Sequence, residues 1–168
     1  ITRSLRKRIR NAPFRITADE NFDKVIECCA NTPRNDQSGT WITQRMQSAY
    51  LELFQQGVAH SIEVWLDDKL VGGLYGIALG RMFFGESMFS HSPDASKVAF
   101  YHLQQHLLAE HYSLIDCQMM NPHLETLGVH PMARTEFLAR LRTNRDKPTK
   151  IGHWTWPPAA TASADNER

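Results

Sequence analysis

The sequence predicts an α+β fold in which a single mixed sheet is flanked by helices. Three strand-like segments follow one another between His60 and Ser90, separated by turn signals. A helical pattern covers residues 95–110, and a short apolar segment, SLIDCQMM, comes directly after it. A meander followed by a helix and one more strand builds one layer of strands with helices on its faces.

The segments before the meander are predicted to be helical. The chain opens on a basic stretch with a helical pattern, ITRSLRKRIRNAPFR. Residues 19–29 form the next predicted helix, because apolar side chains recur on one face at Phe22, Val25, Ile26 and Cys29. A polar, turn-rich loop, NTPRNDQSGT, separates this helix from Trp41 and from a third helix over about 43–56, which Gly57 ends.

The meander and the segments after it complete the predicted order. Turn signals at 67–68 and 80–81 divide the meander into three antiparallel strands. The next helix opens at 93–94, and SLIDCQMM is followed by two further helical segments, HLETLG and RTEFLARLR. This order is typical of N-acetyltransferase-like (acyl-CoA N-acyltransferase) folds. The likeness is one of architecture and leaves the chemistry open.

Composition and charge favour a globular protein with a polyanionic partner. Of the 168 residues, 42% are apolar and 22% charged, and no run is long and apolar enough to span a bilayer. The three cysteines, Cys28, Cys29 and Cys117, are expected to be free thiols in a reducing cytoplasm.

The net charge of +1 hides six basic residues and no acid within residues 1–15. Such an arm suits nucleic-acid phosphate. It equally suits a solvated helix that docks on the body through Leu5 and Ile9, and both can hold at once.

Two predicted strands each carry a carboxylate among apolar residues. Alternation places Met82, Phe84, Glu86 and Met88 on one face of the third meander strand. On SLIDCQMM it places Leu114, Asp116 and Gln118 on one face, opposite Ile115 and Cys117. If the strands are neighbours, Glu86, Asp116 and Gln118 meet in an apolar pocket, where carboxylates act as bases or hold an ammonium. The alternative is that both carboxylates form structural pairs with Arg81, Arg134 or a helix N-terminus.

Other polar and aromatic residues are explained more simply by structural roles. At the joint FSHSPDASK, Ser92 or Asp94 is expected to cap the following helix, although free backbone N–H groups there also suit a phosphate. Trp41 is either a core residue or a residue that stacks on a base. His102 and His106 have a metal-like spacing, but nothing completes a zinc site. No Walker-type loop, dinucleotide fingerprint or nucleophile signature is present.

Five motifs in order, HSIEVW, LVGGLYGIALG, FFGESMFS, DASK and LIDCQ, resemble the bacterial leucyl/phenylalanyl-tRNA–protein transferases. GTWIT and RSLRKRIR fit as well, so the resemblance covers residues 1 to about 142. It implies a cytoplasmic enzyme that moves Leu or Phe, and Met less well, from aminoacyl-tRNA to the N-terminal Arg or Lys of a protein. The modified protein is thereby marked for N-end rule degradation. No cofactor, metal or membrane is implied.

The resemblance also implies site residues and a domain division. We expect the catalytic set to be Asp116, Gln118 and Glu86. By the same resemblance, Trp41, Arg6, Lys7, Arg8 and Arg10 would contact tRNA. From the apolar residues of the strands themselves, we expect the pocket for the aminoacyl side chain to be formed by Leu74, Phe83 or Phe84, Met88 and Ile115, with strand register deciding which Phe faces it.

Residues 1–17 are expected to be a basic arm, the remnant of a junction with an upstream domain whose GGDL- and GIFPW-like motifs are missing from this sequence. Residues 18–156 would be the catalytic domain, and 157–168 a disordered tail.

Two other functions stay open at this point. An acetyl-CoA-dependent N-acetyltransferase would need a glycine-rich turn before the helix at 95, where the sequence has SHSPDASK instead. A non-catalytic RNA-binding module would use the basic arm and keep Glu86 and Asp116 as structural pairs. Transfer of Phe from charged tRNA to a protein beginning with Arg or Lys separates all three.

Overall fold

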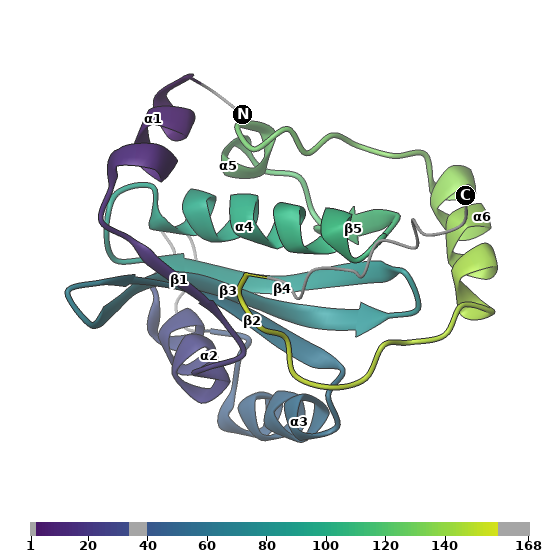
Figure 1. Cartoon of the computed structure of the whole chain (residues 1–168). Helices are drawn as coiled ribbons and strands as arrows, with labels where there is room; N and C mark the ends of the chain where they lie inside the picture. Colours follow the sequence, from purple (N-terminus) through teal and green to yellow (C-terminus); the bar gives the residue numbers. More distant parts are fainter. Residues whose placement is uncertain (1–2, 34–39, 158–168) are drawn as a thin grey trace, which may run out of the picture.

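A computed structural model of the chain describes residues 3–33 and 40–157. The elements in chain order are α1 (Arg3–Asn11), β1 (Arg15–Ala18), α2 (Phe22–Asn31), α3 (Gln44–Gln55), β2 (Ala59–Leu66), β3 (Lys69–Leu79), β4 (Met82–Ser90), α4 (Ala95–Ala109), β5 (Leu114–Asp116), α5 (Pro122–Glu125) and α6 (Arg134–Arg145). The strands form one sheet in the order β1-β2-β3-β4-β5. Only the β4–β5 pair in it is parallel. Figure 1 shows α4 on one face of this sheet and α2 and α3 on the other.

The predicted mixed sheet flanked by helices is therefore confirmed, with three local differences. Residues 15–18 form an edge strand, β1, that pairs with β2, whereas the predicted arm includes residues 15–17 and no strand is predicted there. The strand predicted over SLIDCQMM is shorter, because β5 ends at Asp116 and Gln118 has a positive φ of 63°. The helix predicted at HLETLG has four residues. The predicted disordered tail beyond residue 157 lies outside the described residues, as does most of the loop NTPRNDQSGT.

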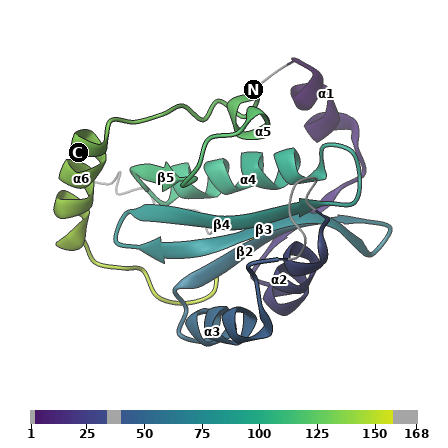
Figure 2. The ribbon, with the colours of Figure 1, turned by 180° about the vertical axis from the view of Figure 1, so that it is seen from behind.

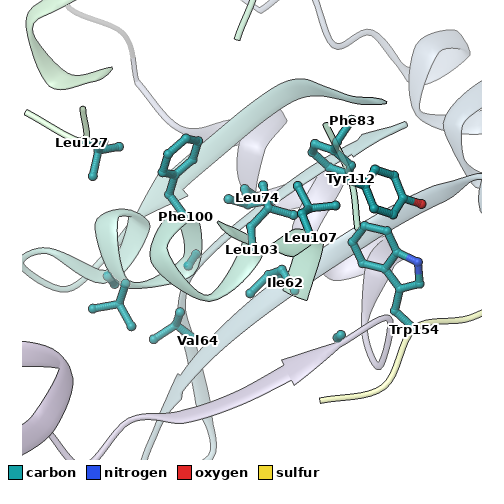
Figure 3. Packing of buried hydrophobic residues seen from close by; sticks show 14 of the residues in the cluster. Ile62, Val64, Leu74, Phe83, Phe100, Leu103, Leu107, Tyr112, Leu127 and Trp154 are labelled. Carbon is teal, nitrogen blue, oxygen red and sulfur yellow. The ribbon is translucent and has the colours of Figure 1, made fainter. Parts of the chain in front are cut away.

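Each face of the sheet has its own apolar core. On the α4 face, Ile62, Leu74 and Phe83 pack against the helix residues Leu103 and Leu107 (Figure 3). On the other face the four apolar side chains predicted to share one side of α2 are all buried, and they pack with aromatic residues of α3 and β3. Burial on both faces explains why the central strands are almost continuously apolar.

The basic arm is docked onto the body rather than free in solution. Within α1, Leu5 is buried in the α4-face core and Ile9 packs against it, as the docking interpretation predicts. Arg6, Lys7 and Arg10 point outward and are exposed. The arm therefore combines an apolar face that is buried with a basic face that is available to a partner.

A β-bulge in β4 changes which side chains share a face. Tyr75 of β3 pairs with Ser87 and Gly76 pairs with Gly85, so Glu86 is the extra residue opposite this step. The predicted common face of Met82, Phe84, Glu86 and Met88 is therefore only partly correct, because Met82 and Phe84 precede the bulge and share a face that Met88 does not. Met88 packs on the α4-face core. Phe84 lies opposite Ile77, which packs on the α2–α3 side.

The segment after α6 returns across the sheet to its far edge, drawn in yellow in Figure 1. Trp154 is buried at its end, stacked between His60 and His106 with ring centroids 3.9 and 4.1 Å away. Its backbone N–H donates to Asp19 at 2.6 Å. This contact fixes the segment after α6 to the turn between β1 and α2, near the start of the chain.

Candidate active site

The predicted site residues Glu86, Asp116 and Gln118 are brought together at the edge between β4 and β5. The side-chain amide of Gln118 donates to the carboxylate of Glu86 at 3.3 Å and to the backbone oxygen of Gly85 at 3.2 Å. Its backbone N–H donates to Asp116 Oδ1 at 2.8 Å. The two carboxylates are thus joined through one residue, Gln118, which binds Glu86 with its side chain and Asp116 with its backbone. The structural pairs with Arg81 or Arg134 are absent among the described residues.

Local backbone geometry makes this arrangement possible. Asp116 is the last residue of β5, and the parallel partner of Phe84. Immediately afterwards Gln118 adopts a left-handed conformation, which turns the chain out of the strand direction. The turn brings the Gln118 amide back over β4, while the bulge places Glu86 outside the regular alternation of that strand.

Tyr50 is a contact of Glu86 that the sequence reasoning missed. This buried residue of α3 forms a side-chain hydrogen bond with Glu86. Burial and then the neighbouring carboxylate raise the pKa of the Tyr50 hydroxyl, which therefore stays protonated and donates. No local pattern distinguishes Tyr50 from a helix core residue, because its partner lies 36 positions away in β4.

A cavity of about 720 Å³ opens beside this cluster. Asp116 and Gln118 line it on one side. Its apolar walls come from α4 through Phe100 and Leu107, and from Ile115 of β5. It is also lined by Leu108 of α4, by Met119 and Met120 before α5, by Met132 just before α6 and by Phe137 of α6. A cavity with apolar walls and a few polar groups is the usual form of a site for an organic ligand.

The predicted side-chain pocket corresponds to this cavity only in part. Ile115 lines it. Leu74, Phe83 and Met88 belong instead to the core cluster of which the cavity residues Phe100 and Leu107 are also members. Phe84 lies on the other side of the sheet, because it is paired with Ile77 of the α2–α3 side. The α4 residues that form the opposite wall were not among the sequence candidates, because they carry no chemistry of their own.

The cap predicted for α4 at Ser92 or Asp94 is wrong. Asp94 has a positive φ of 64° and makes no side-chain cap; it pairs with Lys97 at 2.9 Å. The hydroxyl of Ser90 accepts the N–H of Ser96 instead, at 3.2 Å. Ser90, the last residue of β4, thus caps the helix in place of the residues that directly precede it in sequence.

The predicted RNA contacts occupy two places. Trp41 is 40% exposed and directly precedes α3, the helix that carries Tyr50. In the arm, Arg8 differs from its neighbours, because its guanidinium lies 5.2 Å from the ring centre of Phe14 and donates to the backbone oxygen of Pro93. Arg6, Lys7 and Arg10 are the predicted contacts in the arm whose side chains are exposed to solvent.

The histidines of α4 are packing residues in this structure. His106 stacks on Trp154, and His102 contacts the ring of Trp156 edge-on. Burial lowers the pKa of each imidazole to about 4, so both are neutral at pH 7. In the described residues 3–33 and 40–157 there is no cluster of three or more side chains suited to a metal ion. None of the helices in these ranges is long and apolar enough to cross a membrane.

The fold places the chain among proteins built like N-acetyltransferases. A ribosomal-protein-alanine N-acetyltransferase from Brucella melitensis superposes with a TM-score of 0.50 and 13% identity, over 72% of this chain and 93% of that one. An aminoglycoside acetyltransferase from an uncultured soil metagenomic sample gives a TM-score of 0.51 and 12% identity, over 71% and 93%. At this identity the likeness concerns the fold alone.

Sequence comparison then identifies the family. The profile of the leucyl/phenylalanyl-tRNA protein transferase family matches residues 1–142. A leucyl/phenylalanyl-tRNA–protein transferase of Thiobacillus denitrificans is 51% identical over 93% of this chain and 68% of its own length. One of Chromohalobacter salexigens is 52% identical over 95% and 62%. The chain belongs to the leucyl/phenylalanyl-tRNA protein transferase family, and spans about two thirds of the length of these relatives.

Proposed function

We propose that this chain transfers Leu or Phe, and less readily Met, from aminoacyl-tRNA to the N-terminal Arg or Lys of acceptor proteins. Proteins modified in this way would be marked for N-end rule degradation in the cytoplasm. Family membership supports the class of reaction. The observation that carries the proposal is the Glu86–Gln118–Asp116 cluster, of which Asp116 and Gln118 line a cavity with apolar walls.

The reaction would be aminolysis of an ester. The α-amine of the acceptor attacks the ester carbonyl carbon, a C–N bond forms, and the ester C–O bond breaks. The proton lost by the amine ends on the ribose oxygen of the released tRNA. The ester is already activated, so the protein has to orient the amine, keep it unprotonated and stabilise the tetrahedral oxyanion.

Gln118 and Asp116 are placed to orient the amine. Because Gln118 Nε2 donates to Gly85 and Glu86, its Oε1 is left to accept a hydrogen bond from the attacking amine. Asp116 fixes the backbone of Gln118 through Oδ1 and keeps a second oxygen for the proton. An α-amine has a pKa of about 7.7–8.0, so a carboxylate relay is a sufficient base near neutral pH.

Glu86 would hold the positive charge of the acceptor. Its carboxylate accepts from Gln118 and Tyr50, and both of these donors are neutral groups. The negative charge at this edge of the sheet is therefore available to an ammonium or guanidinium group. The apolar walls formed by Phe100, Leu107 and Ile115 would take the aminoacyl side chain.

Transfer of labelled Phe from Phe-tRNA to a peptide beginning with Arg tests the proposal directly. The unsubstituted chain should form the product, and a peptide beginning with Glu should not be modified. Asp116→Ala should lower the transfer rate by about 100-fold or more, the range for loss of a positioned proton-transfer group. Gln118→Ala should lower it by about 100-fold, because the attacking amine loses its orientation. Asp23→Ala and Gln55→Ala, which alter the same residue types at exposed helix positions, are the matched controls.

The outcomes of this assay are distinct. Unchanged rates in both the Asp116 and the Gln118 variants would remove the assignment of these residues. No transfer by the unsubstituted chain, together with acetyl-CoA binding in calorimetry, would favour the acetyltransferase alternative. Binding of tRNA without transfer would favour the RNA-binding module.

A further inference from the structure

Basic residues are concentrated at both ends of the described chain, and not only in the arm. Residues 134–150 contain six Lys and Arg and two acids, whereas residues 16–133 contain six basic and fourteen acidic residues. In Figure 1 and in the reverse view of Figure 2, α1 and α6 lie at opposite ends of the molecule. An acidic body thus lies between two basic poles.

The way in which α6 is attached leaves its basic side chains on the surface of the molecule. Asn144 is the buried residue of this helix. Its amide donates to Leu79 at 2.9 Å and accepts the N–H of Arg81 at 2.6 Å, which fixes the C-terminal turn of α6 to the β3–β4 turn. The four arginines of α6 are all exposed. One anchored end and a mostly exposed surface do not suit a helix whose role is to cover a core.

A cavity of about 660 Å³ lies between α6 and the β3–β4 turn. The side chains of Arg81, Arg140 and Lys147 line it, with His111 and the hydroxyls of Ser113 and Thr143. No Asp or Glu is among its lining residues, in a region where every residue is described. We call this cavity the basic groove.

The charges in the basic groove are only weakly neutralised by the protein. Arg140 pairs with Glu136 at 2.8 Å on the exposed surface of its own helix. Arg81 donates to the backbone oxygen of Glu110 at 3.1 Å, which leaves its charge without a carboxylate. Lys147 has no ion pair among the described residues. Clustered cations of this kind suit a polyanion.

We propose that the basic groove and α6 form a second phosphate-contact surface, which holds the backbone of the RNA substrate at the end of the molecule opposite the arm. The inference rests on the proposed function, which supplies the RNA. It adds a contact at a distance from α1. The first turn of α6 also lines the candidate substrate cavity through Arg134 and Phe137, so an RNA whose 3′ end lies in that cavity passes beside this helix.

Binding of deacylated tRNA as a function of salt concentration is the test. The double variant Arg140→Gln/Lys147→Gln should reduce the slope of log K against log salt by about 1 to 2, since each phosphate contact contributes roughly 0.7 to 0.9. The matched control is Lys24→Gln/Lys97→Gln, which removes two lysines that form ion pairs within α2 and at the start of α4. Its slope should stay at the value of the unsubstituted chain.

A second readout separates this inference from the proposed function. Phe-tRNA and 3′-O-phenylalanyl-adenosine, which carries no RNA body, are compared as donors to a peptide beginning with Arg. The Arg140/Lys147 variant should use Phe-tRNA less well at limiting concentration and use the adenosine ester normally.

An unchanged salt slope with active transfer would overturn the second surface alone. Equal losses with both donors would overturn it as well, because they would indicate a structural defect. Failure of both donors with the unsubstituted chain would overturn the proposed function, while the salt slope would still report on the groove.

Discussion

Asp19 connects three separate parts of the chain through one buried carboxylate. It accepts the backbone N–H of Ser61 at 2.7 Å, the Nδ1 of His60 at 2.8 Å and the backbone N–H of Trp154 at 2.6 Å. Its φ of 57° is in the left-handed region, which Asp tolerates better than most residues. The edge of the sheet and the C-terminal segment are therefore fixed at the same point.

Replacing Asp19 with Ala should be among the more destabilising single substitutions in this protein. It would leave two backbone donors and one imidazole buried without their acceptor, and hydrogen bonds to charged groups contribute roughly 1.5–3 kcal/mol each. We expect a loss of about 3 kcal/mol or more in the free energy of unfolding, measured by urea denaturation. Asp23→Ala, at an exposed position in the first turn of α2, should cost less than about 1 kcal/mol. Equal losses in the two variants would contradict this role of Asp19.

The β3–β4 pair is the element on which the candidate site depends. Its bulge places Glu86 where Tyr50 and Gln118 reach it. Gly76 lies across from this step, and a Cβ there would approach the backbone oxygen of Phe84 and come within 2.6 Å of Phe83. A glycine is therefore required at this position by the close approach of β4.

Gly76→Ala should disturb the register next to the bulge. The ring of Phe83 is fully buried and cannot yield without displacing the α4-face core, so we expect about 1–3 kcal/mol of destabilisation. Gly85→Ala is the matched control, because a Cβ there comes no nearer than 3.6 Å to the oxygen of Asp116. Thermal unfolding of both variants, followed by circular dichroism, gives the comparison. A Gly76 variant as stable as the Gly85 variant would show that β4 yields more easily than its packing indicates.

The helices and central strands could be predicted from sequence because each repeats one local pattern over many residues. The α2 face is an example, since all four of its predicted apolar positions are buried. The bulge at Glu86 could not be predicted, because nothing in the sequence FFGESMFS marks the residue at which the alternation of side chains between the two faces is interrupted. The shift follows from pairing with β3, a contact between distant residues. The four-residue edge strand β1 was not predicted for a related reason. Its conformation depends on pairing with a neighbouring strand rather than on a sequence pattern of its own.

The candidate site was predictable in its chemistry but not in its shape. Glu86, Asp116 and Gln118 stand out as polar residues in apolar strands, and the structure brings them together. The cavity wall formed by Phe100 and Leu107 has no such signal, because these residues have the same helical spacing as any core residue. A sequence pattern reveals a polar residue in an apolar strand, whereas a pocket depends on how residues from distant segments pack around a space.

The stability of the whole molecule should fall as the pH drops below about 6.5. Burial lowers the pKa of His106 to about 4, and the groups around it are Glu110, His60, Asp19 and Lys150. Between pH 6.5 and 4 the unfolded chain binds a proton at this histidine that the folded chain does not, so the unfolded state is favoured. Glu63 acts in the opposite sense, because burial raises its pKa and the folded chain then holds the extra proton.

The contribution of His106 can be isolated by comparing pH dependences. From pH 7 to pH 5 it should remove about 2 kcal/mol of unfolding free energy, given an unfolded pKa near 6.5. His106→Gln should lower stability at pH 7 through lost packing on Trp154, and should lose correspondingly less between pH 7 and pH 5. Urea titrations at the two pH values measure both terms. Parallel pH dependences in the two proteins would show that His106 does not titrate in this range.

The two basic poles should act on RNA independently, because α1 and α6 lie at opposite ends of the molecule (Figure 2). Substitutions at distant sites with no shared partners are normally additive. Arg6→Gln/Lys7→Gln in the arm and Arg140→Gln/Lys147→Gln at the basic groove should each lower the salt slope of tRNA binding by about 1 to 2. The four-residue variant should then lower it by the sum. A combined change no larger than either single change would mean that the arm and the groove compete for the same phosphates, and that tRNA does not extend from one pole to the other.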